Sequence, residues 1–438
     1  MIKFINHASF IVKNQNFNLL IDPWFSGSSF NNGWDLISKT EVEDKELKEI
    51  THIWFSHEHP DHFSVKDLKY IYSLNRNIKI LFQETFDKRV ISFCKNLGFT
   101  VIEVKNFQKY FFDKNSYIQI IKCGLLDSFA IIKDSNHLIV NMNDCVPQDE
   151  LYKIKNIIND INIDVLFTQF SYADWNGNSA EGYLRKKAIK KKFQQIKDQI
   201  NFFKPKYIVP FASYIYFSNK ENFFMNDEIP KISLVEKMIN ESFSSTSPII
   251  LYPNDDWDYN LRENAESIEK YENDLSKISI KHIPTKVNIN ELINLSKLQV
   301  KKIKKINGNF FMFIIFLYQK LFKKGFQSIN IYIEDINKYV YYDFYFGLRV
   351  IEKCHKRIVI NSEALSTILK FEWGIGTTII NGRFFLENMI YLDNLRSAFS
   401  IPIINSNGIT VFKYYLNKIL NKKSLNIIDD YRENLDID

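Results

Sequence analysis

The chain has 438 residues, of which 45% are hydrophobic and 25% are charged. At about 150 residues per domain this length predicts two or three domains, and the apolar content excludes a disordered or fibrous chain. The 57 basic and 51 acidic residues leave a net charge of +6. So mild an excess over so large a surface does not indicate a nucleic-acid partner.

The cysteines and the apolar runs predict the compartment. Cys94, Cys123, Cys145 and Cys354 are scattered, and no Cys-x-x-Cys pair occurs, which excludes a disulfide framework and a zinc ribbon. The first residues lack the apolar core of a secretory signal. The longest apolar run, residues 310–318, has about half the length that a membrane span needs. We therefore expect a cytoplasmic protein with no membrane partner.

Strand and helix patterns alternate through the first 260 residues. Two β-rich runs, 8–12 and 17–21, flank polar residues and predict a hairpin, and Pro23 ends the second run. A third run, 52–56, leads directly into a group of histidines. Further strands are expected at 78–82, 117–122, 129–132, 138–142, 165–169 and 207–210, and helices at 65–72, 86–97 and 182–203. This alternation indicates an α/β layered fold.

Three units are expected along the chain. A catalytic domain at 1–260 is followed by a helical connector at 261–299 and a smaller C-terminal α+β domain at 300–438. The C-terminal domain either shapes substrate access or mediates dimerisation. The helix at 182–203 is rich in Lys and Arg, and is either a solvated basic face or a docking surface for an anionic substrate or a partner.

The strongest chemical feature is a loop that holds three imidazoles and a carboxylate within six residues, directly after a predicted strand. His57 and His59 are two residues apart and can chelate one metal ion, while Asp61 and His62 turn towards a second position. Imidazole and carboxylate together suit Zn²⁺, Fe or Mn. The loop therefore predicts one or two divalent metal ions.

A His-x-His-x-Asp-His sequence after a strand resembles the metallo-β-lactamase superfamily, and residues 6–12 and 20–27 look like the opening of that fold. Two later stretches, 127–145 and 210–222, resemble the CMP-N-acetylneuraminate hydroxylase branch, which carries a Rieske iron–sulfur domain ahead of this fold. The resemblance implies an αβ/βα sandwich over residues 1–260.

The family's ligands are matched only in part. The resemblance assigns His57, His59, Asp61 and His62 as metal ligands, and Asp144 as the carboxylate that bridges or caps the metals. Where the family has two further histidines, this chain has Cys123 and Asn219. A first metal held by His57 and His59 would take Cys123 or Asp127 as its third ligand. A second metal held by Asp61, His62 and Asp144 would lack its third nitrogen.

Other candidates lie around this loop. Asp22 is expected to orient a ligand histidine from behind, with a turn-forming role as the alternative. His7, Trp34, Tyr172 and Trp175 are candidates for substrate contact; a surface position at a strand end is the alternative for His7, and core packing is the alternative for the aromatic residues.

Three functions remain open at this point. The first is a hydrolase on an anionic small molecule or sugar conjugate, which uses a metal-bound hydroxide with Asp61, His59 and Asp144 as catalytic residues. The second is an iron-dependent oxygenase on a nucleotide-activated sugar. No Cys-x-His…Cys-x-x-His pair occurs in the sequence, so its electrons would come from a separate partner protein. The third is a degenerate, non-catalytic binding protein.

Overall fold

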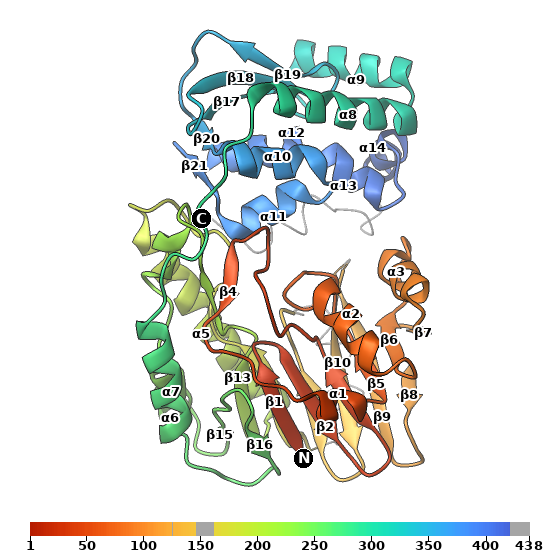
Figure 1. The fold of residues 1–438 in the computed structure, drawn as a ribbon, viewed down its shortest axis with the longest axis vertical. Helices are drawn as coiled ribbons and strands as arrows, with labels where there is room; N and C mark the ends of the chain where they lie inside the picture. The colour runs from red at the N-terminus through yellow and green to blue at the C-terminus, as the bar shows by residue number, and fades with distance from the viewer. Residues whose placement is uncertain (125, 146–161, 421–438) are drawn as a thin grey trace.

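The structure, a computed structural model, describes residues 1–124, 126–145 and 162–420. Two seven-stranded mixed sheets form the lower part of the molecule in Figure 1. The first sheet has the strand order β16 (Asp256–Trp257), β1 (Ile2–Asn6), β2 (Ser9–Lys13), β3 (Asn18–Ile21), β5 (His52–Trp54), β6 (Lys79–Gln83) and β7 (Thr100–Val104). The second has the order β15 (Ser247–Pro248), β13 (Tyr207–Phe211), β12 (Val165–Gln169), β11 (Leu138–Asn141), β10 (Asp127–Asp134), β9 (Ser116–Cys123) and β8 (Lys109–Phe111).

The two sheets pack face to face because alternate side chains along each strand point to opposite faces. In the first sheet Phe10, Leu19 and Trp54 belong to the core between the sheets. Their neighbours Ile11, Leu20 and Ile53 pack instead against helices on the outer face. Those helices are α1 (Asp44–Lys48), α2 (Val65–Leu74) and α3 (Arg89–Leu97).

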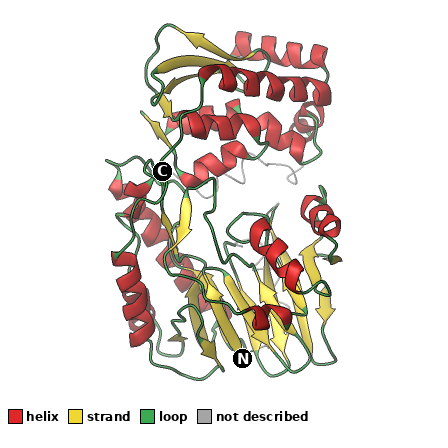
Figure 2. Ribbon diagram, viewed as in Figure 1, coloured by secondary structure: helices red, strands yellow, loops and turns green. Residues whose placement is uncertain are grey.

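The second sheet is covered by α5 (Gly182–Phe203), α6 (Ile232–Ser242) and α7 (Ala265–Ser276), which Figure 2 draws as red helices beside its strands. Ile196, Ile200 and Val235 from these helices join the same core as the strands. The αβ/βα sandwich expected from the resemblance is therefore confirmed.

The C-terminal unit lies above the sandwich in Figure 1. Its five-stranded sheet has the order β19 (Gly347–Ile351), β18 (Lys338–Asp343), β17 (Ile329–Ile333), β20 (Ile358–Ile360) and β21 (Phe384–Leu386). Its helices are α8 (Ile289–Asn307), α9 (Asn309–Phe322), α10 (Ser362–Lys370), α11 (Gly374–Asn381), α12 (Ile390–Ala398), α13 (Ser400–Ser406) and α14 (Val411–Ile419). In the part of the chain that the structure describes, none of the helices has the length and apolar character needed to cross a membrane.

The connector expected at 261–299 contains helical segments that an extended stretch separates. Helix α7 ends at Ser276, the extended stretch follows, and α8 begins at Ile289. The boundary expected at residue 300 falls inside α8. Pro284 lies in the extended stretch, where it cannot continue a helix.

One hydrophobic cluster joins the C-terminal unit to the sandwich. Trp34 and Trp175 from the N-terminal half pack in the same cluster as Ile375 and Phe384. A short ladder between β4 (Trp34–Leu36) and β14 (Ile215–Phe217) lies on the N-terminal side of this junction, and η1 (Phe223–Asn226) follows it.

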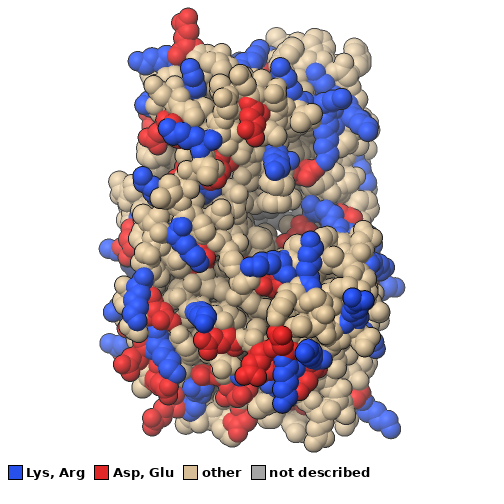
Figure 3. Space-filling model, viewed as in Figure 1, with Lys and Arg blue, Asp and Glu red and all other residues tan. Residues whose placement is uncertain are grey.

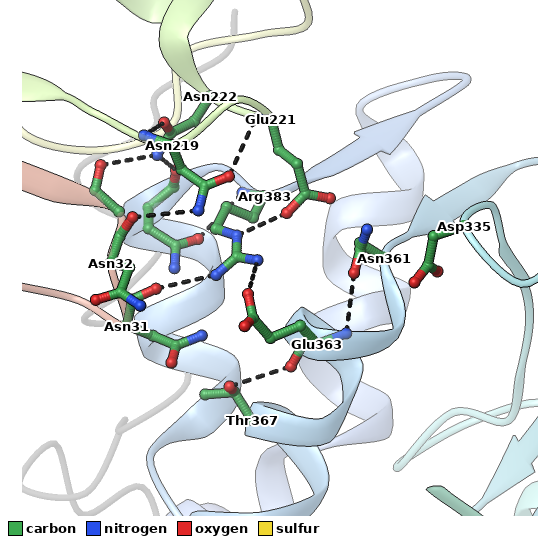
Figure 4. Close-up of polar contacts among 12 residues, drawn as sticks. Asn31, Asn32, Asn219, Glu221, Asn222, Asp335, Asn361, Glu363, Thr367 and Arg383 are labelled. Carbon is green, nitrogen blue, oxygen red and sulfur yellow. Dashed lines mark hydrogen bonds and ion pairs between the residues drawn. The ribbon is translucent and has the colours of Figure 1, made fainter. Parts of the chain in front are cut away.

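A buried arginine fixes the junction through polar contacts (Figure 4). Arg383 is fully buried, and its guanidinium donates to Glu221 (2.7 Å), to Glu363 (2.5 Å) and to the carbonyl of Asn31 (2.9 Å). Asn381 donates to the carbonyl of Phe30 (2.9 Å). The C-terminal unit therefore holds the loop that precedes β4 through its backbone carbonyls, and it holds the segment after β14 through the ion pair with Glu221.

Candidate metal centre

The candidate centre lies where strands of both sheets end. In the first sheet β1, β3 and β5 all point the same way, so His7, Asp22 and the histidine loop follow strand ends on one edge. In the second sheet Asp144 follows β11, which runs parallel to β12 and β13. The amide of Ala212, just after β13, donates to the carbonyl of His7 (2.8 Å), and this bond joins the two edges.

Asp22 organises the histidine loop from behind. It is fully buried and has a positive φ of 41°, a conformation that is uncommon for residues other than glycine. Its carboxylate accepts hydrogen bonds from the amide of Ser56 (2.7 Å), from the Ser56 hydroxyl (2.6 Å) and from Nδ1 of His62 (2.9 Å). The Ser56 hydroxyl in turn lies 2.9 Å from Nδ1 of His57. Both imidazoles are thereby bonded through Nδ1, which leaves Nε2 as the atom available to a metal.

Among the described residues, the side chains that could hold a metal ion form two groups of three, in each of which the candidate ligand atoms lie within 4.8 Å of one another. We call His57, His59 and Asp144 the His57 group, and His7, Asp61 and His62 the His7 group. In the His57 group, Nε2 of His57 lies 2.8 Å from Nδ1 of His59 and 3.8 Å from a carboxylate oxygen of Asp144.

The His7 group is buried more deeply. Nε2 of His7 and Nε2 of His62 each lie 3.3 Å from the same oxygen of Asp61, and all three side chains are at most 4% exposed. His7 itself is held by its amide, which donates to the Asn6 side chain (2.8 Å). His7 also has a positive φ of 44°, so a tight turn between β1 and β2 presents its ring to Asp61.

Asp144 of the His57 group also faces the His7 group. One of its oxygens is 3.4 Å from Nε2 of His62, and the other is 3.8 Å from Nε2 of His57. Gln169, at the end of β12, donates to Asp144 (2.5 Å), and Lys192 of α5 donates to Gln169 (2.6 Å). The ammonium group of Lys192 is thus linked to the Asp144 carboxylate through the side-chain amide of Gln169.

Burial and neighbouring charges set the protonation of these groups. Burial lowers the pKa of His57 and of His59 to about 4, so both imidazoles are neutral near pH 7 and keep a lone pair for a metal. Burial raises the pKa of Asp127 to about 6. Burial also opposes ionisation of Asp61, but the charge on His62 outweighs it and holds the pKa of Asp61 well below its usual value.

Unpartnered polar atoms indicate that a ligand fits here. Among the described residues, Nδ1 of His7, Oδ1 of Asp61 and Nε2 of His62 are buried without a hydrogen-bond partner. Nε2 of His62 is within 3.4 Å of two carboxylates, yet its geometry with neither is that of a hydrogen bond. Buried polar groups are rarely left unpaired. Two imidazoles and a carboxylate in each group therefore fit a divalent ion such as Zn²⁺ or Fe²⁺.

The structure places the expected replacement ligands outside the two groups. Cys123 is half-buried against the core between the sheets, next to Cys145. Asp127 pairs with Cys123 across the β9–β10 hairpin, and its buried carboxylate interacts electrostatically with His59 and Asp144 of the His57 group. The Asn219 amide is occupied by the carbonyl of Asn32 (3.3 Å) and the backbone amide of Glu221 (3.1 Å). Ligand roles for Cys123, Asp127 and Asn219 stay predictions, and the contacts of Asn219 do not favour such a role.

The aromatic candidates for substrate contact are core residues. Trp34, Tyr172 and Trp175 are at most 3% exposed and belong to the cluster that joins the C-terminal unit to the sandwich. The Tyr172 hydroxyl donates to the carbonyl of Met225. Core packing, the alternative given for these residues from the sequence, describes their positions.

His7 is the residue whose place the sequence indicated least well. It was expected to contact substrate or to lie on the surface. Its ring lies instead beside Asp61 and His62, the residues expected to hold a second metal for which the sequence offered no further nitrogen. One signal was present: His7 and Asp22 each follow a strand, and two strands separated by one antiparallel neighbour end at the same edge of a sheet. Gln169 and Lys192 were not singled out, because nothing in their spacing relates them to Asp144.

The sequence matches known proteins over part of its length. Residues 1–119 match the model of a β-lactamase superfamily domain. Cytidine monophosphate-N-acetylneuraminic acid hydroxylase of Cricetulus griseus is 25% identical over 261 residues, which cover 54% of this chain and 45% of the relative. The Danio rerio hydroxylase is 25% identical over 233 residues, covering 48% and 37%. The chain thus spans less than half the length of the curated relatives that it matches.

A solved structure described as a possible metal-dependent hydrolase from Veillonella parvula superposes with a TM-score of 0.44 at 15% identity, covering 58% of this chain and 97% of that one. The order of strands in the two sheets and the matched superfamily domain define the fold. The N-terminal part of this chain has the metallo-β-lactamase fold, and the chain is similar in sequence to the CMP-N-acetylneuraminic acid hydroxylases.

Proposed function

We propose that the chain is a dinuclear metal-dependent hydrolase acting on an anionic small molecule or sugar conjugate. The observation that carries the proposal is the position of Asp144, whose two oxygens lie 3.4 and 3.8 Å from His62 and His57. A carboxylate between two sets of ligands is suited to a two-metal hydrolytic site. When bound, the ions would lower the pKa of water and polarise the bond to be cut.

The chain's own residues would bind and orient. His57 and His59 would offer neutral nitrogens, and Asp22 would keep His62 turned with Nε2 towards the centre. The unpartnered Oδ1 of Asp61 would accept a proton from the attacking water, as a general base does. Lys192, connected to Asp144 through Gln169, would favour an anionic substrate.

Metal content tests the two groups separately. By inductively coupled plasma mass spectrometry, the wild-type chain should hold about two ions. His7→Ala and His59→Ala should each lose one of them, because each removes one of three ligands in its group. His355→Ala changes an exposed histidine and serves as the control. If His7→Ala keeps the wild-type metal content, the His7 group is not a ligand set.

A second candidate is an iron-dependent hydroxylase of a nucleotide-activated sugar, with electrons from a separate partner. Two observations favour it: the relatives are CMP-N-acetylneuraminic acid hydroxylases, and each group has two histidines and one carboxylate, the donor set of non-haem iron oxygenases.

Two reconstitutions separate these reactions. Zinc-loaded and iron-loaded protein are each incubated with CMP-N-acetylneuraminate, with and without oxygen and a chemical reductant, and the products are analysed by mass spectrometry. Cleavage by the zinc form without oxygen supports the hydrolase. Oxygen insertion by the iron form alone supports the hydroxylase and contradicts the hydrolase. A chain that retains neither metal would instead be the non-catalytic binding protein.

A further inference from the structure

Helix α9 exposes an apolar stripe along its whole outer side. Phe310 and Leu321, near its two ends, are 76% and 75% exposed. Between and beside them the exposed apolar residues repeat every three or four positions, which places them on one face of the helix. The stripe consists of Phe310, Phe313, Ile314, Leu317, Tyr318, Leu321 and Phe322.

The opposite face of α9 packs against the rest of the C-terminal unit. Met312 and Phe316 are buried in a cluster with residues of α8, α13 and α14, and Gln319 is buried beside them. The outer stripe is therefore not needed for this packing. It continues onto α14, where Phe412 is 60% exposed and its ring lies 5.9 Å from that of Phe311. An exposed apolar surface of this extent marks an interaction site.

Along the sequence, the charged residues that flank the stripe are of one sign, and of these Lys302 pairs with Glu372 of the segment after α10. From Leu292 to Ile333 the sequence contains no acidic residue, and its basic residues are Lys297, Lys301, Lys302, Lys304, Lys305, Lys320, Lys323 and Lys324. Lys301 and Lys305 lie on the last turns of α8, while Lys323 and Lys324 follow α9, and all four are exposed. Figure 3 shows blue side chains over α8, just below the tan surface where Figure 1 draws α9.

We propose that the outer face of α9 docks on a bilayer surface that contains anionic lipids, with the helix axis parallel to the membrane. Aromatic and aliphatic side chains on one face with lysines at the flanks are the features of an interfacial helix. Each lysine near an anionic surface adds attraction. The helix has 14 residues, or about 21 Å at 1.5 Å per residue, too short to cross the bilayer core. It therefore lies on the membrane and does not span it.

Charge argues against a second copy of the chain as the occupant. A twofold contact through α9 would bring two lysine-rich segments together, and like charges placed opposite one another are repelled. The absence of a membrane partner was expected from the lack of a spanning segment. A face that lies on the bilayer needs no such segment, so the docking proposal revises that expectation and is independent of the reaction at the metal centre.

Cosedimentation of the full-length protein with liposomes tests the proposal. Phosphatidylcholine liposomes are compared with liposomes that also contain phosphatidylserine, at low and high salt. Phe310→Ser/Leu321→Ser removes the ends of the stripe, with Leu261→Ser/Ile283→Ser, equally exposed residues elsewhere, as the control. The flank variant, Lys323→Glu/Lys324→Glu, reverses the charge of the two lysines that follow α9. Its charge-matched control is Lys190→Glu/Lys237→Glu, on α5 and α6. Thermal melts confirm that each variant is folded.

The wild-type protein should sediment with the anionic liposomes, less so at high salt because ions screen the attraction. The stripe variant should bind about tenfold more weakly or worse, since two large apolar side chains no longer enter the interface. The flank variant should lose binding and both controls should keep it. Wild-type protein that stays in the supernatant overturns the proposal. A second outcome also overturns it: light scattering shows that the wild-type protein is a dimer and the stripe variant a monomer, while neither binds liposomes.

Discussion

A single buried carboxylate, Asp22, orients the histidine loop. It accepts three hydrogen bonds, two from Ser56 and one from His62. In Asp22→Asn one acceptor oxygen becomes an amide nitrogen, so the bond to His62 or to Ser56 is lost. Groups behind metal ligands typically contribute about 10–100-fold to metal affinity, and we expect a loss in that range in competition with a chromophoric chelator. Asp258→Asn alters an exposed aspartate, and equal affinities in the two variants would contradict the role of Asp22.

A buried histidine outside the centre makes stability depend on pH. Burial, with a contribution from Lys79, lowers the pKa of His52 from 6.5 to about 4, and its ring packs 4.9 Å from that of Phe112. As pH falls below about 6.5, His52 becomes protonated in the unfolded chain, whereas in the native chain it stays neutral until about pH 4. The free energy of unfolding therefore decreases over this interval.

The variant His52→Asn removes this contribution. Near neutral pH the wild-type protein should have the higher urea midpoint, and its advantage should shrink as pH falls towards about 4. His355→Asn, an exposed histidine, should leave the pH dependence of the wild type unchanged. A midpoint difference between wild type and His52→Asn that is constant across this range would rule out the depressed pKa.

At the level of single residues, the sequence identified side chains that are close along the chain. His57, His59, Asp61 and His62 lie within six residues, so their proximity needs no tertiary information. His7 is fifty residues from His57, and only the order of strands in the first sheet brings the two together. The aromatic residues were harder to judge, because an exposed and a buried tryptophan have the same local sequence signal.

Among the elements, the loop before β4 and the start of β21 depend on Arg383. Replacing this residue by methionine would leave Glu221 and Glu363, which are 21% and 19% exposed, without their cation. Removing one partner of a buried ion pair costs about 3–5 kcal/mol, which urea denaturation would detect. Arg357→Met breaks an exposed pair of 4.0 Å with Glu387 and should cost less than about 1 kcal/mol. Similar losses in the two variants would mean that Arg383 does not hold the junction.

Elements with a long regular pattern were predictable from the sequence. The helix expected at 182–203 and the strand expected at 165–169 have those bounds in the structure. The strands β4 and β14 were not predicted, since each has only three residues. The extended stretch between α7 and α8 was not predicted, because periodicity alone does not reveal where one helix ends and the next begins.

For the whole molecule, the shared cluster predicts cooperative unfolding. Trp24, Trp34 and Trp175 are buried together with residues of α11 and β21, so unfolding of either half would expose the cluster that the two halves share. Calorimetry should record one transition, and a chelator should move it to lower temperature, because a ligand that binds only the native state stabilises that state. Two separate transitions in the metal-loaded protein would contradict this coupling. The cytoplasmic location and a role of the C-terminal unit in dimerisation stay predictions.

The two candidate ligand groups depend on different parts of the fold. His7, Asp61 and His62 all follow strands of the first sheet, so their spacing is a property of that sheet alone. The His57 group takes Asp144 from the second sheet, and its geometry therefore changes whenever the two sheets shift against each other. The geometry of the His7 group is set within one sheet, whereas that of the His57 group reports the relative position of the two sheets. A ligand or partner that alters the packing of the sheets would act on the candidate centre through Asp144, without touching any of the histidines.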